Sequence, residues 1–456
     1  MLMYRLMQGF LRVVVAIFFR NIEVIGKENI PQDGSIIFAG NHPNSLIDPL
    51  MVITQSGKVV HFAARDGLFK SRFLRFFLDS LGAVPIKKRQ DHKPTDGKVD
   101  NQAAFDALFS VLSKGGCMGI FPEGISHTDS EMSTFKTGTA RIAFGVHEKH
   151  PETKLWIVPV GLTYMHRQRV RSQCLIQFDE PIAIDEAWME RYKEAPKETV
   201  RALTSLLDLR LRGVTLNAPD WETMRILHTA RRLYKPDRVH LSLEEYAELT
   251  RRFAEGYLRV SDKPEVQALR EHLADYQSHL DSLQIRDHDL RKDAPPLRVF
   301  GKILRRLSYL LIMLPLAIPG ALLHMPIIFS AIVAGDRLTR RKDVVATTKL
   351  IVSVLTIPML YAALLLGLTW YISPWVALFT APFLPLTGFA TMRVLEEKLQ
   401  IGKSLTALSR LVRFEQEVEE LRQKRKELVQ EIDRAVDHHH DPSIPRMFEK
   451  SATSAS

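Results

Sequence analysis

Two long stretches without a charged side chain constrain this sequence more than any other feature. Residues 350–392 form an uncharged run of 43 residues, and residues 307–335 form a second run of 29. About 18 consecutive apolar residues already mark a candidate membrane-spanning helix. The rest of the chain is rich in charge, so the average composition hides these runs. We therefore exclude a purely soluble protein.

The two uncharged runs predict a membrane module in residues 303–393. The longer run divides at Ser373-Pro374 into segments that are each close to the ~20 residues needed to cross a bilayer, which predicts a transmembrane hairpin. The shorter run contains Pro315, Pro319 and Pro326, and prolines interrupt straight helices. Lys and Arg flank both of its ends, and cytoplasmic loops are enriched in these residues. We therefore predict a re-entrant hairpin here, with one kinked span as the alternative.

Residues 21–185 follow a different pattern, in which short apolar runs alternate with segments of helical periodicity. Several of the runs do not alternate with polar residues, as expected of strands that are buried on both faces of a parallel sheet. This pattern predicts an α/β domain with a mostly parallel sheet flanked by helices. The predicted strands are residues 36–39, 59–63, 118–121, 155–160 and 175–178.

The N-terminal residues 1–20 are predicted to form a mostly apolar helix. Arg5, Gln8 and Arg12 share one stripe of this helix. An apolar helix with a basic stripe, too short to span, is typical of a helix that lies in the membrane interface. A helix buried on the following domain is the alternative.

The other segments outside the two modules are predicted to be helical. Residues 186–302 are charged and helical in period, which indicates a connector. Within residues 394–436, apolar side chains from Ala407 to Ile432 recur at alternating four- and three-residue steps. This spacing predicts a coiled-coil helix that pairs two copies of the chain, and packing back onto the same chain is the alternative. Residues 437–456 are a polar tail.

The excess of basic residues indicates that the binding partners of this chain are anionic. Lys and Arg number 62 and Asp and Glu number 52, which gives a net charge of +10. The basic residues concentrate beside the apolar runs, which fits anionic lipids better than nucleic acid. Two cysteines, Cys117 and Cys174, cannot form a disulfide framework or a cysteine-rich zinc site. The run His438-His439-His440 lies in the polar tail and is expected to be solvated, so we predict no metal and no cofactor.

The first candidate for catalysis is the sequence Asn41-His42-Pro43-Asn44-Ser45-Leu46-Ile47-Asp48, directly after the first predicted strand. The carboxyl ends of strands are where α/β sheets expose reactive groups. If the chain turns and a helix starts near Ser45, with Asn44 or Ser45 as its N-cap, then Asp48 can reach His42. An aspartate that accepts a hydrogen bond from one imidazole nitrogen leaves the other free to take a proton. Since no serine or cysteine nucleophile accompanies the pair, the nucleophile would be a substrate hydroxyl.

The second candidate, Phe121-Pro122-Glu123-Gly124, follows another predicted strand. Together with His-x4-Asp, in this order, it resembles the glycerolipid acyltransferase family. Two further blocks agree, namely Gly82-Ala83-Val84-Pro85-Ile86-Lys87-Lys88-Arg89 and Ile157-Val158-Pro159-Val160-Gly161. The resemblance covers about Val24 to Asp185.

The resemblance implies transfer of an acyl group from acyl-CoA or acyl-carrier protein, as a co-substrate, to a glycerol-phosphate acceptor. It implies that His42 takes the proton of the acceptor hydroxyl, that Asp48 orients His42, and that Glu123 and Gly124 shape the acceptor site. The common family pattern has an arginine after the Glu-Gly pair, but no Arg or Lys occurs here between Gly124 and Phe135. The acceptor phosphate needs a cation. The nominated cations are Arg89 and Lys136, with Lys88 and Arg141 behind them.

We therefore expect a membrane-bound acyltransferase of phospholipid biosynthesis. The tail of the third block, Ser126-His127 and Phe135-Lys136-Thr137-Gly138, favours glycerol-3-phosphate or dihydroxyacetone phosphate as the acceptor. A lysophosphatidate or other lysophospholipid acyltransferase is the first alternative, and a non-catalytic membrane tether is the second. The expected location is the cytoplasmic face of a membrane, a bacterial inner membrane in preference to the endoplasmic reticulum.

Overall fold

The computed structural model describes residues 2–87, 102–237, 239–290, 296–440 and 445–448. The chain divides into two compact units. The first unit contains Met1–Trp221, Leu241–Arg251 and Thr339–Thr347. The second unit contains Glu222–His240, Arg252–Leu338 and Thr348–Ser456.

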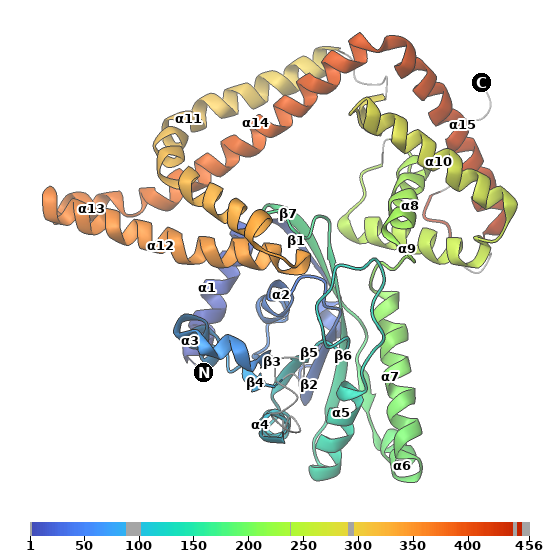
Figure 1. Cartoon of the computed structure of the whole chain (residues 1–456). Coiled ribbons are helices and arrows are strands. Elements are labelled where there is room, and N and C mark those ends of the chain that lie inside the picture. Colours follow the sequence, from blue (N-terminus) through green and yellow to red (C-terminus); the bar gives the residue numbers. More distant parts are fainter. Residues whose placement is uncertain (1, 88–101, 238, 291–295, 441–444, 449–456) are drawn as a thin grey trace. The chain divides into compact units, whose positions relative to one another are not determined.

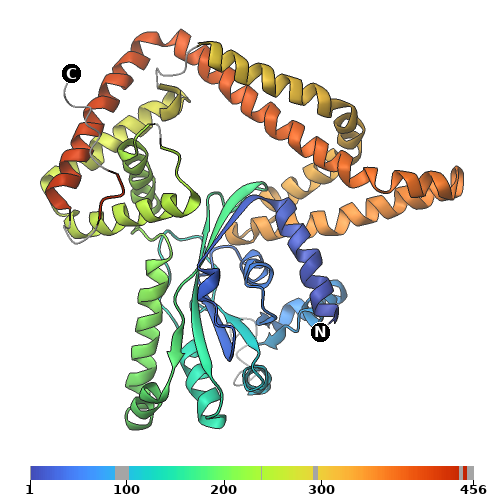
Figure 2. The same ribbon diagram turned by 180° about the vertical axis from the view of Figure 1, so that it is seen from behind.

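The first unit is built on an eight-stranded, mostly parallel sheet with the order β1-β7-β6-β2-β5-β3-β4, in which β8 also pairs with β6 (Figures 1 and 2). Only the β6/β7 and β6/β8 pairs are antiparallel within the described chain. The predicted fold class is confirmed. The strands are β1 (Phe19–Ile25), β2 (Ser35–Gly40), β3 (Val60–Arg65), β4 (Val84–Ile86), β5 (Cys117–Ile120), β6 (Leu155–Tyr164), β7 (Ser172–Phe178) and β8 (Ile182–Ile184).

Helices flank this sheet on both faces. They are α1 (Leu2–Phe18), α2 (Ile47–Gln55), α3 (Arg72–Ser80), α4 (Gln102–Leu112), α5 (Gly138–Lys149), α6 (Glu186–Glu194) and α7 (Pro196–Gly213). On one face, Leu108 of α4, Phe144 of α5 and Leu207 of α7 share a buried core with Ile37 and Ile157 of the central strands. The central strand β2 is buried along its whole length, which explains why its sequence shows no polar alternation.

Helix α1 packs within the first unit through one mostly apolar face, which buries Tyr4, Met7, Gln8, Leu11, Val15 and Phe18. The amide of Gln8 is buried and donates to the carbonyl oxygens of Ile53 (2.7 Å) and Lys58 (3.0 Å), and Arg12 Nε donates to Thr54 O (3.1 Å). The opposite face of α1 exposes apolar side chains, namely Leu2, Met3, Leu6, Phe10, Val13 and Ile17. One face of the helix is therefore packed on its own domain, as in the predicted alternative, while the other face exposes apolar side chains.

The second unit is helical. Its helices are α8 (Trp221–Tyr234), α9 (Leu243–Val260), α10 (Pro264–Ser282), α11 (Pro296–Val333), α12 (Val345–Tyr371), α13 (Pro374–Thr380), α14 (Phe383–Arg413) and α15 (Glu415–His439), of which α8, α9 and α12 begin in the first unit. In α15, Val418, Leu421, Leu428 and Ile432 are buried in one core with residues of α8 and α10, such as Leu233 and Tyr276. The predicted coiled-coil seam thus packs on its own chain, which is the alternative that we left open.

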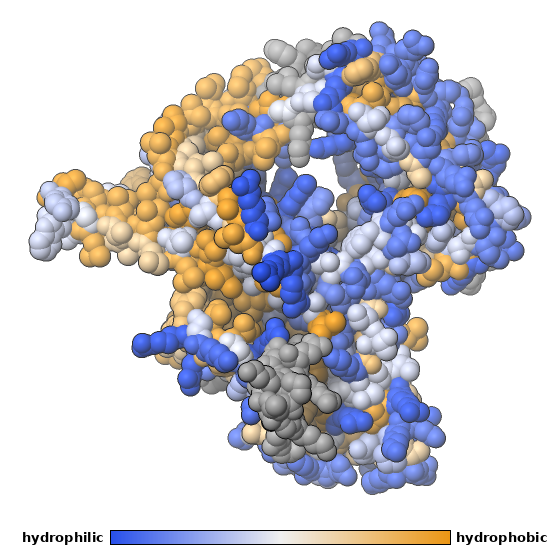
Figure 3. Space-filling view, viewed as in Figure 1, coloured by the Kyte–Doolittle hydropathy of each residue, from blue (hydrophilic) through white to orange (hydrophobic). Residues whose placement is uncertain are grey.

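Three helices of the described chain are long and apolar enough to cross a membrane, by length and composition. They cover Leu304–Leu338, Lys342–Tyr371 and Pro374–Gly402. Hydrophobic residues gather over this region, on α11 to α13 (Figure 3). The structure has a single helix, α11, where we predicted a re-entrant hairpin, and Figures 1 and 2 show that this helix is sharply bent. It contains Pro315, Pro319 and Pro326, each of which removes a backbone donor, so the kinked single helix is the better description.

His324 of α11 links the apolar helices of the second unit. It is buried, and its ring nitrogens contact Gly320 O (2.8 Å) and the hydroxyl of Tyr361 on α12 (2.8 Å). On the side of α14, a Cβ added to Gly388 would lie 2.9 Å from His324 Nε2. These contacts assign His324 to helix packing.

Candidate functional site

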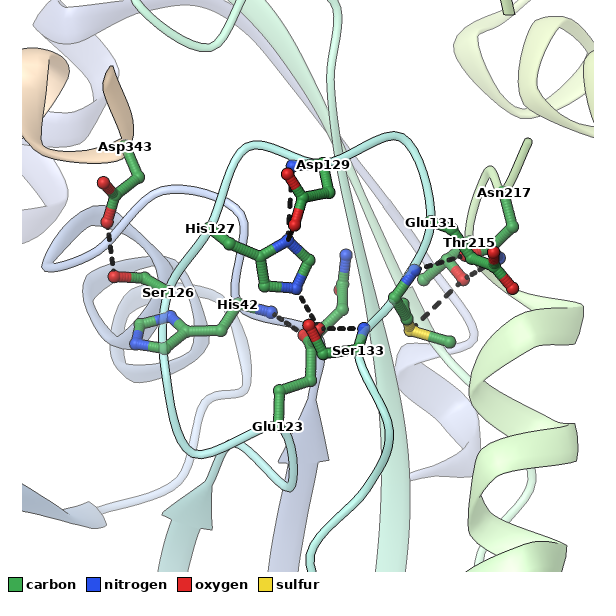
Figure 4. Close-up of polar contacts among 12 residues, drawn as sticks. His42, Glu123, Ser126, His127, Asp129, Glu131, Ser133, Thr215, Asn217 and Asp343 are labelled. Atoms are coloured by element: carbon green, nitrogen blue, oxygen red, sulfur yellow. Dashed lines mark hydrogen bonds and ion pairs between the residues drawn. The ribbon is translucent and has the colours of Figure 1, made fainter. Parts of the chain in front are cut away.

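The two sequence motifs meet at one edge of the sheet. Strands β2 and β5 are parallel neighbours, with Ala39 opposite Ile120, so both end at the same edge. His42 follows the end of β2, and Glu123 follows the end of β5. The backbone N–H of His42 donates to Glu123 Oε1 at 2.8 Å, which joins the two loops directly (Figure 4).

A tight turn brings Asp48 back to His42. Ser45 has a positive φ of 45°, and helix α2 begins at Ile47. His42 Nδ1 lies 2.8 Å from Asp48 Oδ2. The expected N-cap at Asn44 or Ser45 is wrong, since Leu46 occupies the cap position without a side-chain cap bond. The Asn44 N–H instead donates to the Asp48 carboxylate at 2.7 Å, and this bond closes the turn.

The Asp48 side chain is fully buried, and both of its carboxylate oxygens have hydrogen-bond partners. Oδ2 accepts from Asn44 N and faces His42 Nδ1, while Oδ1 accepts from the Tyr164 hydroxyl at 2.7 Å. Burial, reinforced by the adjacent Asp48 charge, holds the pKa of Tyr164 well above its ordinary value, so Tyr164 remains a donor. Because an ionised carboxylate only accepts, Nδ1 of His42 carries the hydrogen. Nε2 is then the nitrogen available to a substrate.

The His42 ring is fixed in orientation and open to solvent on one side. It stacks on Phe121 with ring centroids 4.0 Å apart and an interplanar angle of 6°, and 18% of its side chain is exposed. Phe121 in turn stacks on Phe62 of β3. Gly119 lies under this stack, and a Cβ there would come within 2.0 Å of the Phe62 ring, which explains the glycine. The imidazole points away from Glu123, although its own backbone N–H faces that carboxylate (Figure 4).

Glu123 braces the loops of the site. Its side chain is almost fully buried, and its oxygens accept from His42 N, Ser133 N (2.8 Å) and the ring of His127. The following Gly124 has a φ of +74°, a conformation that suits glycine. These contacts position backbone segments of both loops, and the expected role of Glu123 in shaping the acceptor site stays a prediction.

Glu123 and His127 form an ion pair that lowers the pKa of Glu123 and raises the pKa of His127. Burial alone would raise the pKa of Glu123, but the hydrogen bonds from His127, Ser133 N and His42 N outweigh it and lower that pKa below 4.5. The hydrogen bond to Glu123, aided by the charges of Glu123 and Asp129, raises the pKa of His127 above 6.5 against the effect of burial. The second ring nitrogen of His127 lies 3.3 Å from Asp129 Oδ2.

The nominated cations lie in different places. Lys136 is exposed, and its Nζ lies over the Glu-Gly turn, since a Cβ added to Gly124 would come within 2.5 Å of it. Arg141 is exposed on α5. Lys88 and Arg89 lie outside the described residues. The structure therefore brings Lys136 to the Glu123 turn.

The sequence analysis missed three contributors to the site. Tyr164, at the end of β6, bonds Asp48 as described above. Ser126 Oγ contacts Asp343 Oδ2 (2.5 Å), and Arg341 Nη2 donates to the Ser126 carbonyl (3.0 Å), so the segment Thr339–Thr347 fastens the loop after the Glu-Gly pair (Figure 4). Arg167 lies in the connection after β6. No local pattern in the sequence marked any of these contacts.

One group of side chains in the second unit has the composition of a metal site. Ligand atoms of Glu265, His438 and His439 all lie within 4.8 Å of one another. Glu265 and His438 are exposed, and exposed groups of this kind are common without an ion. We assign no metal to them.

Comparisons with known proteins agree with the two-part organisation. Residues 21–163 match the family model described as Acyltransferase. Residues 226–444 match the model described as Glycerol-3-phosphate acyltransferase 2 C-terminal domain. Both models describe acyltransferases, so the predicted resemblance to the glycerolipid acyltransferase family is confirmed.

Individual relatives carry names from this family. Glycerol-3-phosphate O-acyltransferase 2 of Saccharomyces cerevisiae is 28% identical over 76% of this chain and 63% of its own length. Glycerol-3-phosphate O-acyltransferase 1 of the same yeast is 24% identical over 78% of this chain and 60% of its own length. The chain thus spans less than two thirds of these two relatives. The solved structure of the acyltransferase PlsC from Thermotoga maritima is 20% identical, with a TM-score of 0.31, over 44% of this chain and 79% of that one.

The Glu123–His127 pair predicts a pH-dependent contribution to stability. Because the pKa of His127 is raised on folding, its contribution is complete below pH 6.5 and is lost as the pH rises through the raised value. The lowered pKa of Glu123 means that its contribution is present above pH 4.5 and is lost as the pH falls through the lowered value. We expect the difference in unfolding free energy between wild type and His127→Gln to shrink as the pH rises above 6.5.

Unfolding at a series of pH values from about 5 to 9, followed by tryptophan fluorescence, measures this difference. His150→Gln is the matched control, because its partner Glu152 is largely exposed. A difference that stays constant or grows towards high pH would contradict the assigned ion pair.

Proposed function

We propose that this chain transfers a fatty acyl group from acyl-CoA or acyl-carrier protein to the hydroxyl of glycerol-3-phosphate or dihydroxyacetone phosphate. The observation that carries the proposal is the His42–Asp48 contact at the edge where β2 and β5 end, with Nε2 left for a substrate. The names of the yeast relatives support the acceptor class. No cofactor takes part, since the thioester donor supplies the activated acyl group.

The reaction follows from the geometry of the pair. Nε2 of His42 accepts the proton of the acceptor hydroxyl while its oxygen attacks the thioester carbonyl. Asp48 holds the ring by Nδ1 and stabilises the imidazolium that forms. When the tetrahedral intermediate collapses, the new C–O bond remains, the C–S bond breaks, and the proton passes from His42 to the leaving thiolate. The products are the acyl ester and the free thiol.

Purified protein in lipid vesicles, given a labelled acyl donor and one acceptor at a time, tests the proposal. The acceptors are glycerol-3-phosphate, dihydroxyacetone phosphate and lysophosphatidate. We expect transfer to one of the first two, and His42→Ala should lower kcat by about 10²- to 10⁴-fold because the general base is lost.

His150→Ala changes a partly exposed histidine after α5; it is the control and should retain wild-type activity. Transfer to lysophosphatidate alone would replace the proposed acceptor with that of a lysophospholipid acyltransferase. Absence of transfer with every acceptor would leave the membrane tether as the function.

We also propose that Lys136 contributes a positive charge to the acceptor site. Its ammonium lies over the Glu123-Gly124 turn, where the common family pattern has an arginine close by. Lys136→Met should raise the KM for the phosphorylated acceptor several-fold and leave the KM for the acyl donor unchanged. Steady-state kinetics with each substrate varied in turn measure both constants, and Arg141→Met is the exposed neighbour for comparison. An unchanged acceptor KM in Lys136→Met would remove this residue from the site.

The proposed location is a membrane, with the site on its cytoplasmic face. The basic residues Arg337, Arg340, Arg341 and Lys342 precede α12, and cytoplasmic loops are rich in such residues. Both native cysteines are buried, so single introduced cysteines can report topology. We expect a membrane-impermeant maleimide to label Arg340→Cys only in inside-out vesicles and Ile372→Cys only in intact cells.

The reverse labelling pattern would place the site on the other face. The choice of a bacterial inner membrane over the endoplasmic reticulum remains a prediction, which fractionation of the source cells tests. Recovery of the protein with the endoplasmic reticulum would overturn that choice.

A further inference from the structure

Arg167 is the side chain near the catalytic pair whose role the reaction above does not explain. It lies in the connection between β6 and β7, beyond the carboxyl end of β6. Strand β6 is parallel to β2, so this connection leaves the sheet at the same edge as His42. The carbonyl oxygen of Arg167 accepts a hydrogen bond from Asn44 Nδ2 at 3.1 Å. Arg167 is therefore tied to the turn that holds His42 and Asp48.

The guanidinium of Arg167 is held in place, but no carboxylate of the described residues forms an ion pair with it. Its central carbon lies 5.0 Å from the centroid of the Trp221 ring, which is a cation–π contact. Nη1 is buried and has no hydrogen-bond partner among the described residues. A buried donor without a partner is unfavourable, and such groups in folded proteins point to a catalytic role or an absent ligand.

The neighbouring carboxylates do not satisfy this cation. The charges of Asp48, Asp129 and Glu123 act on Arg167, which places the guanidinium within electrostatic reach of both motifs. The oxygens of Asp48 are occupied by Asn44 N, Tyr164 and His42, as described above. Both oxygens of Glu123 are also occupied by their own donors. Burial lowers the pKa of Arg167, and the three carboxylates and Tyr164 oppose this effect, so the side chain stays charged.

We propose that Arg167 binds the phosphate group of the acceptor and so adds a second cation, beside Lys136, to a site that lacks the arginine after the Glu-Gly pair. The planar guanidinium offers two parallel donors to two phosphate oxygens, a geometry that an ammonium cannot reproduce. On binding, the guanidinium of Arg167 donates to the phosphate, and the bound acceptor places its hydroxyl near Nε2 of His42. Arg167 thereby selects a phosphorylated acceptor over an uncharged alcohol. The inference rests on the proposed acyl transfer for its substrate, although the phosphate site can be tested without turnover.

The kinetic test compares Arg167→Met and Arg167→Lys with wild type. Loss of a charge-assisted bidentate contact corresponds to about a 10- to 100-fold change in affinity, so Arg167→Met should raise the acceptor KM by that factor. The KM for the acyl donor should stay unchanged, and Arg167→Lys should give an intermediate acceptor KM. Arg169→Met, an exposed arginine two residues along the same connection, is the matched control and should behave as wild type.

Glycerol serves as the uncharged acceptor in the same assay. Wild type should prefer glycerol-3-phosphate to glycerol, and Arg167→Met should lose most of this preference. A purely structural role for Arg167 would lower kcat for both acceptors alike and leave their ratio unchanged, which would overturn the proposal. If Arg167→Met does not fold, Arg167→Lys gives the same comparison, because lysine keeps the positive charge and loses the bidentate donor geometry of the guanidinium.

Binding without turnover separates this inference from the proposed function. In the His42→Ala protein, glycerol-3-phosphate binding is measured by titration calorimetry, and adding Arg167→Met should weaken it by the same 10- to 100-fold. If wild type transfers no acyl group but this binding depends on Arg167, the proposed function fails and the phosphate site stands. If wild type is active and neither the acceptor KM nor this binding changes in the variants, the phosphate site fails alone.

Discussion

The candidate site depends on the buried carboxylate of Asp48. A carboxylate removed from water is costly unless donors replace its hydration shell. Here Asn44 N, the Tyr164 hydroxyl and His42 Nδ1 replace it. The three donors come from the turn after β2 and from the end of β6, so the same bonds that stabilise the charge also fix the imidazole against the sheet.

A second buried carboxylate, that of Glu123, holds the backbone of the loops around the site. It joins the backbone of His42 to that of Ser133 and to the ring of His127, and thus positions the loop after β5 against the loop after β2. The contacts of Ser126 with Arg341 and Asp343 tie the loop after β5 to the residues that precede α12. The loops that form the site are therefore held by buried charges, while the ring of His42 keeps an accessible nitrogen. Beside these loops, Nη1 of Arg167 has no hydrogen-bond partner among the described residues.

The sequence predicted the parts of the fold that depend on local pattern. Short apolar runs located β2, β3, β5, β6 and β7, and the run of β2 does not alternate because this strand is buried along its whole length. Strand β1 was missed because it is an edge strand with Arg20, Asn21 and Glu23, and β4 and β8 are only three residues long. The bonds of Gln8 in α1 could not be predicted, since the carbonyl groups that accept them belong to residues 45 and 50 positions away.

For the site as well, contacts between residues close in sequence were predictable and contacts between distant residues were not. The contact of His42 with Asp48 follows from six residues of local sequence, whereas the bonds of Asp343 to Ser126 join residues 217 positions apart and leave no local pattern. The apolar seam of α15 was visible as a spacing, but spacing does not reveal whether the partner is another copy or the same chain. Arg167 was missed for a similar reason, because its significance lies in an unpaired nitrogen that only three-dimensional contacts reveal.

The central claim is that His42 and Asp48 act as one unit in proton transfer. A double-mutant cycle measures this most directly, with kcat for acyl transfer determined in vesicles for wild type, His42→Ala, Asp48→Asn and the double variant. Residues that act as a unit lose activity non-additively. The account predicts that Asp48→Asn alone is strongly impaired and that the double variant is no slower than His42→Ala. A double variant whose fold-loss in kcat equals the product of the two single losses would contradict the account, as would an Asp48→Asn protein with wild-type kcat.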